Sequence, residues 1–380
     1  MRNGLMSCKK REKHLWPALF IGALVLFFWT GALQAQSLKD LPPPPPAPTP
    51  KPTPTPRPLT DEDFDIVRVS SNLVMVPVSV VDSGGEPVLG LQANDFRIEE
   101  EGRLQQIAQI GDPDQVPLDI ALLFDISSSV SQKGFFEFQQ TAAASFLRLV
   151  LKPVDRAAIF TIADRALLVQ PLAPAQTAAA RLLTIPAATT PVPTAFYDTV
   201  VAASQYLLDN SNDGRRRVIV VISDGDDNFS NKVRDLTIAE VRASQDGTLT
   251  PATVRQNLQL RHRQAVVETQ RGVQQADISF YSINPGGTSV RLNEISQRAQ
   301  TAMQSIAEAT GGTAFVPNSE KDLERVFSEI GAELRGQYLL QYYSNSESPA
   351  GQFRRIKVST PTRQELRVRA RQGYYPKGKV

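Results

Sequence analysis

Two mainly apolar runs, at residues 118–124, which include one charged residue, Asp119, and at 218–222, place the strongest constraint on the fold of this chain. Short runs of this kind are typical of strands that are buried on both faces of a parallel sheet. Helix and strand patterns alternate around them, which predicts an α/β fold with a doubly wound, mostly parallel sheet. We expect further strands at 156–162, 167–172, 278–283 and 314–316, and helices at 135–151, 195–208, 265–276, 302–309 and 323–334.

β-rich segments precede and follow the α/β region, at residues 63–115 and 336–380. Their strand candidates are 66–81, 96–100, 338–343, 353–359 and 366–374. We expect the two segments to pair into one small β-sandwich, with the α/β domain of residues 116–335 inserted between them. Residues from about 230 to 263 are polar and rich in Arg, Gln and Thr, and we predict an insertion there.

The first 36 residues resemble an export signal in composition. Basic residues precede an uncharged apolar stretch at 15–33, and small residues follow it. This pattern predicts a signal peptide, or an uncleaved signal anchor, because the stretch is long enough to span a bilayer. We therefore expect an exported protein that is periplasmic, at the cell surface or secreted. If the segment is uncleaved, it anchors the chain in the inner membrane, facing outward, and is its only membrane contact.

Residues 37–62 form a Pro-rich linker, with 11 prolines between residues 42 and 58. Proline lacks a backbone N–H and has a fixed φ, so this segment favours extended polyproline II over helix or sheet. A ligand for a proline-binding domain is one interpretation of such a tract. Its position directly after the export segment favours a spacer that holds the folded part away from a surface.

Composition narrows the chemistry that this chain can perform. The formal net charge is +2, which argues against a nucleic-acid-binding protein. The chain has one cysteine and two histidines, which excludes a four-cysteine zinc site and argues against a Ser-His-Asp triad. Cys8 and His14 lie in the export segment, so cleavage would leave only His262. We therefore expect any metal site to use oxygen ligands.

Oxygen-bearing side chains follow both apolar runs. Asp125, Ser127 and Ser129 come directly after residues 118–124, and Asp224 follows the second run within Ser-Asp-Gly. The carboxyl ends of parallel strands meet at one edge of a sheet, where ligands bind in open α/β folds. Carboxylates and hydroxyls suit a hard cation such as Mg²⁺.

Thr194 precedes an expected helix and offers one more hydroxyl to the same edge. Each of these elements alone is also typical of a turn or of a helix N-cap. Asp226 and Asp227 add two nearby acids, which we interpret as part of a solvated loop.

The order D-x-S-x-S, then Thr before a Tyr-Asp pair, then S-D-G, resembles the metal-ion-dependent adhesion site of von Willebrand factor type A domains. The match spans roughly residues 116–335, and the flanking segments are similar to acidobacterial-type von Willebrand factor A-related proteins. Pro193 and Ser128 stand where that family usually has Gly, and neither change removes a ligand. The resemblance implies that Mg²⁺, or Mn²⁺, is bound by Asp125, Ser127, Ser129, Thr194 and Asp224.

The resemblance also implies an open coordination position that accepts an Asp or Glu carboxylate from a partner protein. We therefore predict an exported, metal-dependent protein-binding module with no catalytic residues. One alternative is a phosphoryl-transfer or hydrolytic α/β enzyme that uses Asp125, although such enzymes usually have a second acid where this chain has Ser127. The sequence contains no G-x-S-x-G, H-E-x-x-H or P-loop motif. The other alternative is a passive envelope scaffold whose metal site is vestigial.

Overall fold

The computed structural model describes residues 73–127, 136–286, 294–346, 349 and 351–376. All of them belong to one compact unit that begins at Arg68. The predicted export segment and Pro-rich linker, and Ser129, lie outside the described residues. Within the described part of the chain, no helix is long and apolar enough to cross a membrane.

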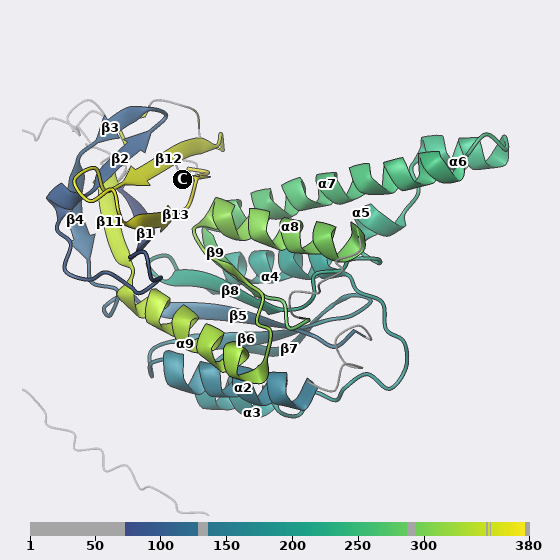
Figure 1. Ribbon diagram of the computed structural model, residues 1–380, viewed down its shortest axis with the longest axis horizontal. Coiled ribbons are helices and arrows are strands. Elements are labelled where there is room, and N and C mark those ends of the chain that lie inside the picture. The colour runs from purple at the N-terminus through teal and green to yellow at the C-terminus, as the bar shows by residue number, and fades with distance from the viewer. Residues whose placement is uncertain (1–72, 128–135, 287–293, 347–348, 350, 377–380) are drawn as a thin grey trace, which may run out of the picture. The chain divides into compact units, whose positions relative to one another are not determined.

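A six-stranded sheet with the order β10-β9-β8-β5-β6-β7 forms the centre of the α/β part (Figure 1). Its strands are β5 (Leu118–Asp125), β6 (Arg156–Ile162), β7 (Ala166–Ala173), β8 (Arg216–Ile222), β9 (Ile278–Ile283) and β10 (Ala314–Phe315). All neighbouring strands are parallel except β7, which runs antiparallel to β6 at one edge. Every residue of β5 and β8 is buried, as expected for central strands that are covered on both faces.

Helices cover both faces of this sheet. The helices on one face are α2 (Phe136–Val150), α3 (Ala175–Leu182) and α9 (Glu320–Gly336), and on the other α4 (Phe196–Asn210), α7 (Pro251–Gln275) and α8 (Glu294–Thr310). Side chains of β5 alternate between the two cores, with Leu122 and Phe124 in the first and Ala121 and Leu123 in the second. The predicted fold class, a doubly wound and mostly parallel α/β sheet, is therefore confirmed.

The two flanking segments form two four-stranded sheets that share one core. One sheet has the order β13-β1-β11-β4 and the other β14-β12-β2-β3. The strands are β1 (Leu73–Val81), β2 (Arg97–Glu100), β3 (Arg103–Gln105), β4 (Ile107–Gly111), β11 (Tyr338–Tyr343), β12 (Arg354–Ser359), β13 (Arg367–Ala370) and β14 (Gly373–Tyr374). Val76, Ile98 and Tyr342 are among the buried residues of the common core. Each sheet combines strands from both segments, so the predicted sandwich is confirmed. The strand expected at 366–374 is instead two strands, one in each sheet.

Residues 231–275 form three helices, α5 (Asn231–Arg234), α6 (Ile238–Gln245) and α7. The insertion predicted at about 230–263 therefore continues without a break into the helix predicted at 265–276. Local signals explain where these helices begin. Thr237 and Glu240 form a capping box at α6, while Thr250 accepts a hydrogen bond from the third residue of α7 and Pro251 occupies its first turn.

A buried polar cluster joins the α/β part to the sandwich. The Glu333 carboxylate, on α9, accepts hydrogen bonds from the Ser79 hydroxyl at 2.8 Å and the Tyr281 hydroxyl at 3.1 Å, and pairs with Arg369 at 2.7 Å. These partners belong to β1, β9 and β13. A buried carboxylate with this number of partners holds α9 in one position against both sheets.

Candidate metal centre

The predicted carboxylates lie at the same edge of the central sheet. β5 and β8 are parallel neighbours, and Phe124 is the register partner of Ile222. Asp125 ends β5, and Asp224 comes two residues after the end of β8. Both carboxylates therefore follow the carboxyl ends of neighbouring parallel strands. This arrangement is the one expected from the strand ends.

Asp125 is a buried carboxylate without a cationic partner in the described part of the chain. Its side chain is 0% exposed. One oxygen accepts the backbone N–H of Ser127 at 2.7 Å, and the other accepts the hydroxyl of Ser223 at 2.5 Å. Burial raises the pKa of Asp125 to about 6, the hydrogen bonds from Ser127 and Ser223 oppose this shift, and the charge of Asp224 adds to it. The ionised form is therefore costly unless a cation compensates it.

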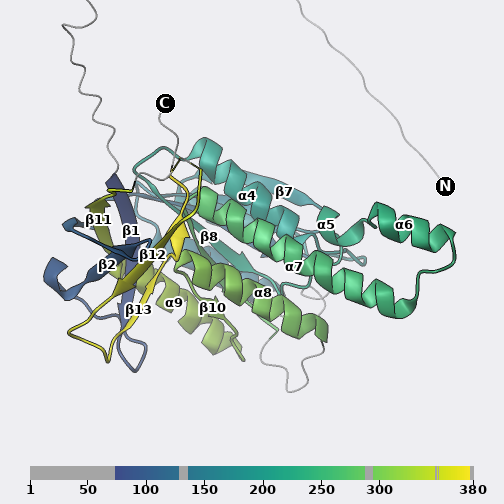
Figure 2. The same ribbon diagram turned by 90° about the horizontal axis from the view of Figure 1, so that it is seen from above.

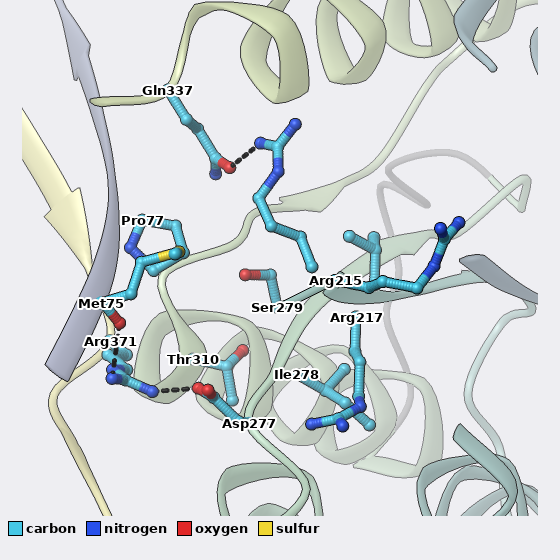
Figure 3. A pocket seen from close by; sticks show the side chains of 12 residues that line it. Met75, Pro77, Arg215, Arg217, Asp277, Ile278, Ser279, Thr310, Gln337 and Arg371 are labelled. Carbon is cyan, nitrogen blue, oxygen red and sulfur yellow. Dashed lines mark hydrogen bonds and ion pairs between the residues drawn. The ribbon is translucent and has the colours of Figure 1, made fainter. Parts of the chain in front are cut away.

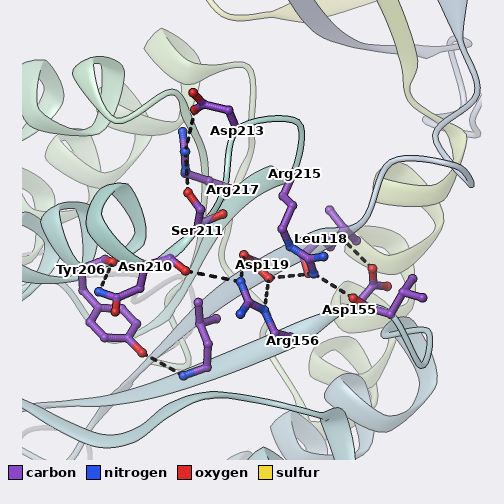
Figure 4. Close-up of polar contacts among 12 residues, drawn as sticks. Leu118, Asp119, Asp155, Arg156, Tyr206, Asn210, Ser211, Asp213, Arg215 and Arg217 are labelled. Atoms are coloured by element: carbon purple, nitrogen blue, oxygen red, sulfur yellow. Dashed lines mark hydrogen bonds and ion pairs between the residues drawn. The ribbon is translucent and has the colours of Figure 1, made fainter. Parts of the chain in front are cut away.

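Asp119 occupies the other end of β5 and provides an internal comparison (Figure 4). It is equally buried, but it pairs with Arg156 at 2.6 Å and with Arg215 at 2.9 Å. Burial alone would raise the pKa of Asp119, but the hydrogen bonds from the two guanidinium groups lower it below its ordinary value. The strand thus holds two buried acids, of which one is neutralised by arginine and the other is not.

Thr194 lies beside the loop that follows Asp224. Its N–H donates to the Asn228 side chain at 2.9 Å, and its carbonyl accepts the N–H groups of Asn228 and Phe229, each at 3.0 Å. The residue is buried as a whole, its hydroxyl forms no hydrogen bond with any described residue, and this hydroxyl remains available as a ligand. Pro193 fits this arrangement, because the contacts to the loop use the backbone of the residue after it.

Asp227 is not part of a solvated loop, and that prediction was wrong. Its buried carboxylate accepts the N–H of Tyr197 at 2.8 Å, and the N–H and hydroxyl of Ser230 at 3.0 and 2.5 Å. Burial raises its pKa although these hydrogen bonds oppose the shift. Asp227 therefore joins the first turn of α4 to the start of α5, a position where a helix N-terminus favours negative charge. Asp226 is partly buried, and burial raises its pKa too.

Two further residues shape this edge and were not singled out from the sequence. Ser223 orients Asp125 through the hydrogen bond described above, and its oxygen also accepts the N–H of Gly225 at 2.9 Å. Gly225 has a φ of +72°, and a Cβ at this position would lie 2.8 Å from Met303. The S-D-G triplet at a strand end was the available signal, since a tight turn there needs a hydroxyl and a glycine as well as the acid.

The chemistry of the donors fits a hard divalent cation. Asp125, Ser127, Thr194 and Asp224 supply only oxygen, and Ser129 lies outside the described residues. Within the described ranges, no group of three or more His, Cys, Asp or Glu side chains forms a metal-binding cluster. Two carboxylates would balance the two charges of a bound dication and neutral hydroxyls would add uncharged oxygen ligands, which suits Mg²⁺ or Mn²⁺ with an exchangeable position.

A cavity of about 50 Å³ lies at the opposite edge, next to the amino ends of β8 and β9 (Figure 3). The guanidinium groups around it point in different directions and have structural partners. Arg216 donates to the Leu334 carbonyl at 2.8 Å and to the Gln337 side chain at 3.1 Å, while Arg371 pairs with Asp277. This cavity is therefore part of the contact between the central sheet and the sandwich. It lies at the opposite end of the strands from Asp125 and Asp224, whose surroundings are here called the metal edge.

Comparisons with known proteins give similarity in structure only. No family model and no curated relative matches the chain. A von Willebrand factor type A protein from Catenulispora acidiphila is 12% identical and covers 70% of this chain and 51% of its own length, with a TM-score of 0.41. An aerotolerance-related membrane protein from Bacteroides fragilis is 16% identical over 57% of this chain and 98% of its own length, with a TM-score of 0.36.

Proximal thread matrix protein 1 of the mussel byssus, solved with zinc in its MIDAS motif, is 15% identical over 59% of this chain and 47% of its own, with a TM-score of 0.39. The solved structures similar to this chain thus include von Willebrand factor type A proteins, as the sequence motifs led us to expect. Identities this low transfer no activity, so the function has to be inferred from the residues of this chain.

Proposed function

We propose that this chain is an exported protein-binding module that uses Mg²⁺, or Mn²⁺, to capture a carboxylate of a partner protein. Asp125, Ser127, Ser129, Thr194 and Asp224 would hold the metal. When bound, the ion supplies an electrophilic coordination position to which an Asp or Glu side chain of the partner can bind. The role of the protein is to hold its own oxygens at one sheet edge and to limit the negative charge around them.

The state of Asp125 carries this proposal. A fully buried carboxylate normally has a cationic partner, as Asp119 has at the other end of the same strand. Asp125 has hydrogen bonds from Ser127 and Ser223 instead, which orient it without neutralising its charge. A bound dication would compensate both this charge and that of Asp224. The buried edge is therefore built at a cost in stability that a bound metal would relieve.

Calorimetric titration of the metal-free full chain with Mg²⁺ or Mn²⁺ tests the metal site. We expect saturable binding that is lost in Asp125→Ala. Asp209→Ala is the matched control, because Asp209 is an exposed acid near the end of α4. The proposal fails if the wild type binds neither ion at millimolar concentration.

Partner capture is tested by affinity purification from envelope and culture fractions, in Mg²⁺ and in EDTA. We expect a protein that is retained by the wild type in Mg²⁺ and is released by EDTA. The same protein should be absent from the Asp125→Ala sample. Retention that is equal in EDTA and in the variant would favour a passive scaffold with a vestigial site.

The proposed location depends on the N-terminal 62 residues. Their basic, apolar and Pro-rich order supports export followed by a spacer. N-terminal sequencing of the mature protein would show whether the first residue lies after the small-residue segment near Ala35. A mature chain that begins at Met1 would indicate the anchored alternative.

A further inference from the structure

We propose that α5, α6 and α7 (Asn231–Gln275), here called the helical arm, form a second docking surface for the partner bound at the metal edge. The surface fits an acidic protein segment that carries apolar side chains. The inference rests on the proposed function, because it assigns both surfaces to one partner. It adds a contact that does not require metal.

The arm begins directly after the loop that follows Asp224. Residue Ser230, directly before α5, is held by Asp227, and its hydroxyl accepts the N–H of Asp198 at 3.0 Å. Asp198 in turn accepts the N–H of Asn231, the first residue of α5, at 3.0 Å. The same loop binds the backbone of Thr194. The start of the arm is thus fixed relative to a proposed metal ligand by contiguous hydrogen bonds.

A buried ion pair makes the arm a built element and not a loose extension. Glu240 of α6 pairs with Arg261 of α7, and both side chains are buried. Arg261 also donates to the carbonyl of Val233 in α5 at 3.1 Å. One guanidinium group therefore connects all three helices. Breaking a buried pair of this kind is costly, so α6 is held against α7 in one arrangement.

The segment that contains α6 exposes several aliphatic side chains. Leu236, Ile238 and Val241 lie within a stretch of six residues and are 48%, 74% and 41% exposed. Both views show α6 at the free end of α7, beyond the ends of α4 and α8 (Figures 1 and 2). No other described element covers these side chains. A cluster of exposed apolar residues with a polar rim is typical of a protein interaction site.

The charge of the arm defines the occupant as acidic. Its exposed ionic side chains comprise six bases, Lys232, Arg234, Arg242, Arg255, Arg263 and Arg271, and three acids, Asp235, Asp246 and Glu268. Within the described part of the chain, Arg242, Arg255 and Arg263 form no ion pair. An acidic partner would complement this surplus and would also supply the carboxylate for the metal edge.

Two other occupants fit the arm less well. A second copy of the arm would bring the same basic surplus against itself. A membrane surface would be expected to meet aromatic and aliphatic residues along one helix face, and residues 231–275 contain no Phe, Tyr or Trp. The exposed aliphatic side chains and the basic surplus of the arm therefore favour an acidic protein.

The test uses the full chain and two synthetic probes, a glutamate–leucine copolymer and a lysine–leucine copolymer. Affinity is measured in Mg²⁺ and in EDTA for the wild type and for Ile238→Asp. Residue 238 is the first of α6, where an acid is compatible with the helix N-terminus, so the variant should fold. Leu149→Asp is the matched control, since Leu149 is 79% exposed on α2 and the added charge is the same.

We expect the acidic copolymer to bind the wild type at least about tenfold more tightly than the basic one, with part of the affinity retained in EDTA. Ile238→Asp should lower the affinity for the acidic copolymer by about tenfold in both conditions, as for a central interface residue. Leu149→Asp should leave it unchanged, and Ile238→Asp should titrate with Mg²⁺ as the wild type does.

Equal effects of Ile238→Asp and Leu149→Asp would overturn the inference. So would self-association of the wild type in sedimentation that Ile238→Asp abolishes, which would identify a second copy as the occupant. Binding to anionic lipid vesicles but not to the acidic copolymer would identify a membrane. Failure of the metal site itself is distinguishable, because it would remove Mg²⁺ binding and leave the contact measured in EDTA.

Discussion

Protonation of His262 should destabilise the folded chain as the pH falls. The imidazole lies on α7, is 3% exposed, and its Nδ1 has no hydrogen-bond partner in the described part of the chain. Its ring lies in an edge arrangement against that of Tyr197 on α4, with the centroids 6.0 Å apart. Burial, followed by the positive charges of Arg298 on α8 and Arg261 on α7, lowers the pKa of His262 to about 4.

The size of the effect follows from the difference between the pKa values of the folded and unfolded chain. The folded value of about 4 lies below the ordinary value of 6.5, so the unfolded chain binds the proton first as the pH falls. The stability that neutral His262 contributes is fully present well above pH 6.5 and is lost as the pH falls toward the pKa of the folded state. Linkage gives a loss of about 0.4 kcal/mol at pH 6.5, about 1.4 kcal/mol at pH 5.5 and about 2.5 kcal/mol at pH 4.5.

Urea unfolding of the wild type and of His262→Phe, at several pH values between neutral and acid, measures this loss. Phenylalanine keeps a ring against Tyr197 but cannot be protonated, so other titrating groups cancel in the difference between the two proteins. Far-ultraviolet circular dichroism is the suitable probe, because Trp16 and Trp29 both precede the described residues. A free-energy difference that stays constant from pH 7 to pH 4.5 would refute the reasoning.

Three further predictions concern the metal edge and the arm. Gly225→Ala should destabilise the protein and weaken Mg²⁺ binding, because the new Cβ combines a positive φ with a clash against Met303. Gly247→Ala is the control: its φ is also positive but its Cβ has open space, so it should lower the free energy of unfolding by only about 1 kcal/mol in a chemical-unfolding assay. Glu240→Ala leaves the buried Arg261 unpaired, so it should lower the free energy of unfolding by about 3 kcal/mol and speed amide hydrogen exchange in α6. Glu268→Ala removes an exposed ion pair and should change the free energy of unfolding by less than about 1 kcal/mol. Mg²⁺ at about 100 times its dissociation constant should raise the free energy of unfolding by about 2.7 kcal/mol, and EDTA should reverse the shift in the melting temperature.

The central sheet was predictable because buried parallel strands carry a strong local signal. In this sheet β6 and β9 begin and end at the residues expected from their apolar patterns, and in the sandwich β11 does so too. The shared edge of Asp125 and Asp224 followed from those strands, since a parallel register brings successive strand ends together. The sandwich also followed, because a β segment on each side of an inserted domain has the other as its natural partner.

The arm and the loop contacts were not predictable in the same way. α7 has 25 residues of which six are buried, so its apolar stripe is too sparse to show a helical period. Its capping residues and its Gln, Arg and Ala content were the available helix signals. The hydrogen bond from Ser223 to Asp125 joins residues 98 positions apart, and that from Tyr197 to Asp227 joins residues 30 apart. Such contacts depend on the completed fold and leave no local pattern.

The amino and carboxyl ends of the parallel strands, called here the amino edge and the carboxyl edge, make different kinds of contact. At the amino edge, β5 follows the sandwich strand β4, and α9 leads directly into β11, so both ends of the α/β domain are attached to the sandwich there. Arginines neutralise the buried acid at this edge, as the pairs of Asp119 show. At the carboxyl edge, the buried Asp125 has no such partner, and the arm is rooted beside it. A partner that binds the metal edge and the arm would therefore approach from the side opposite to the sandwich.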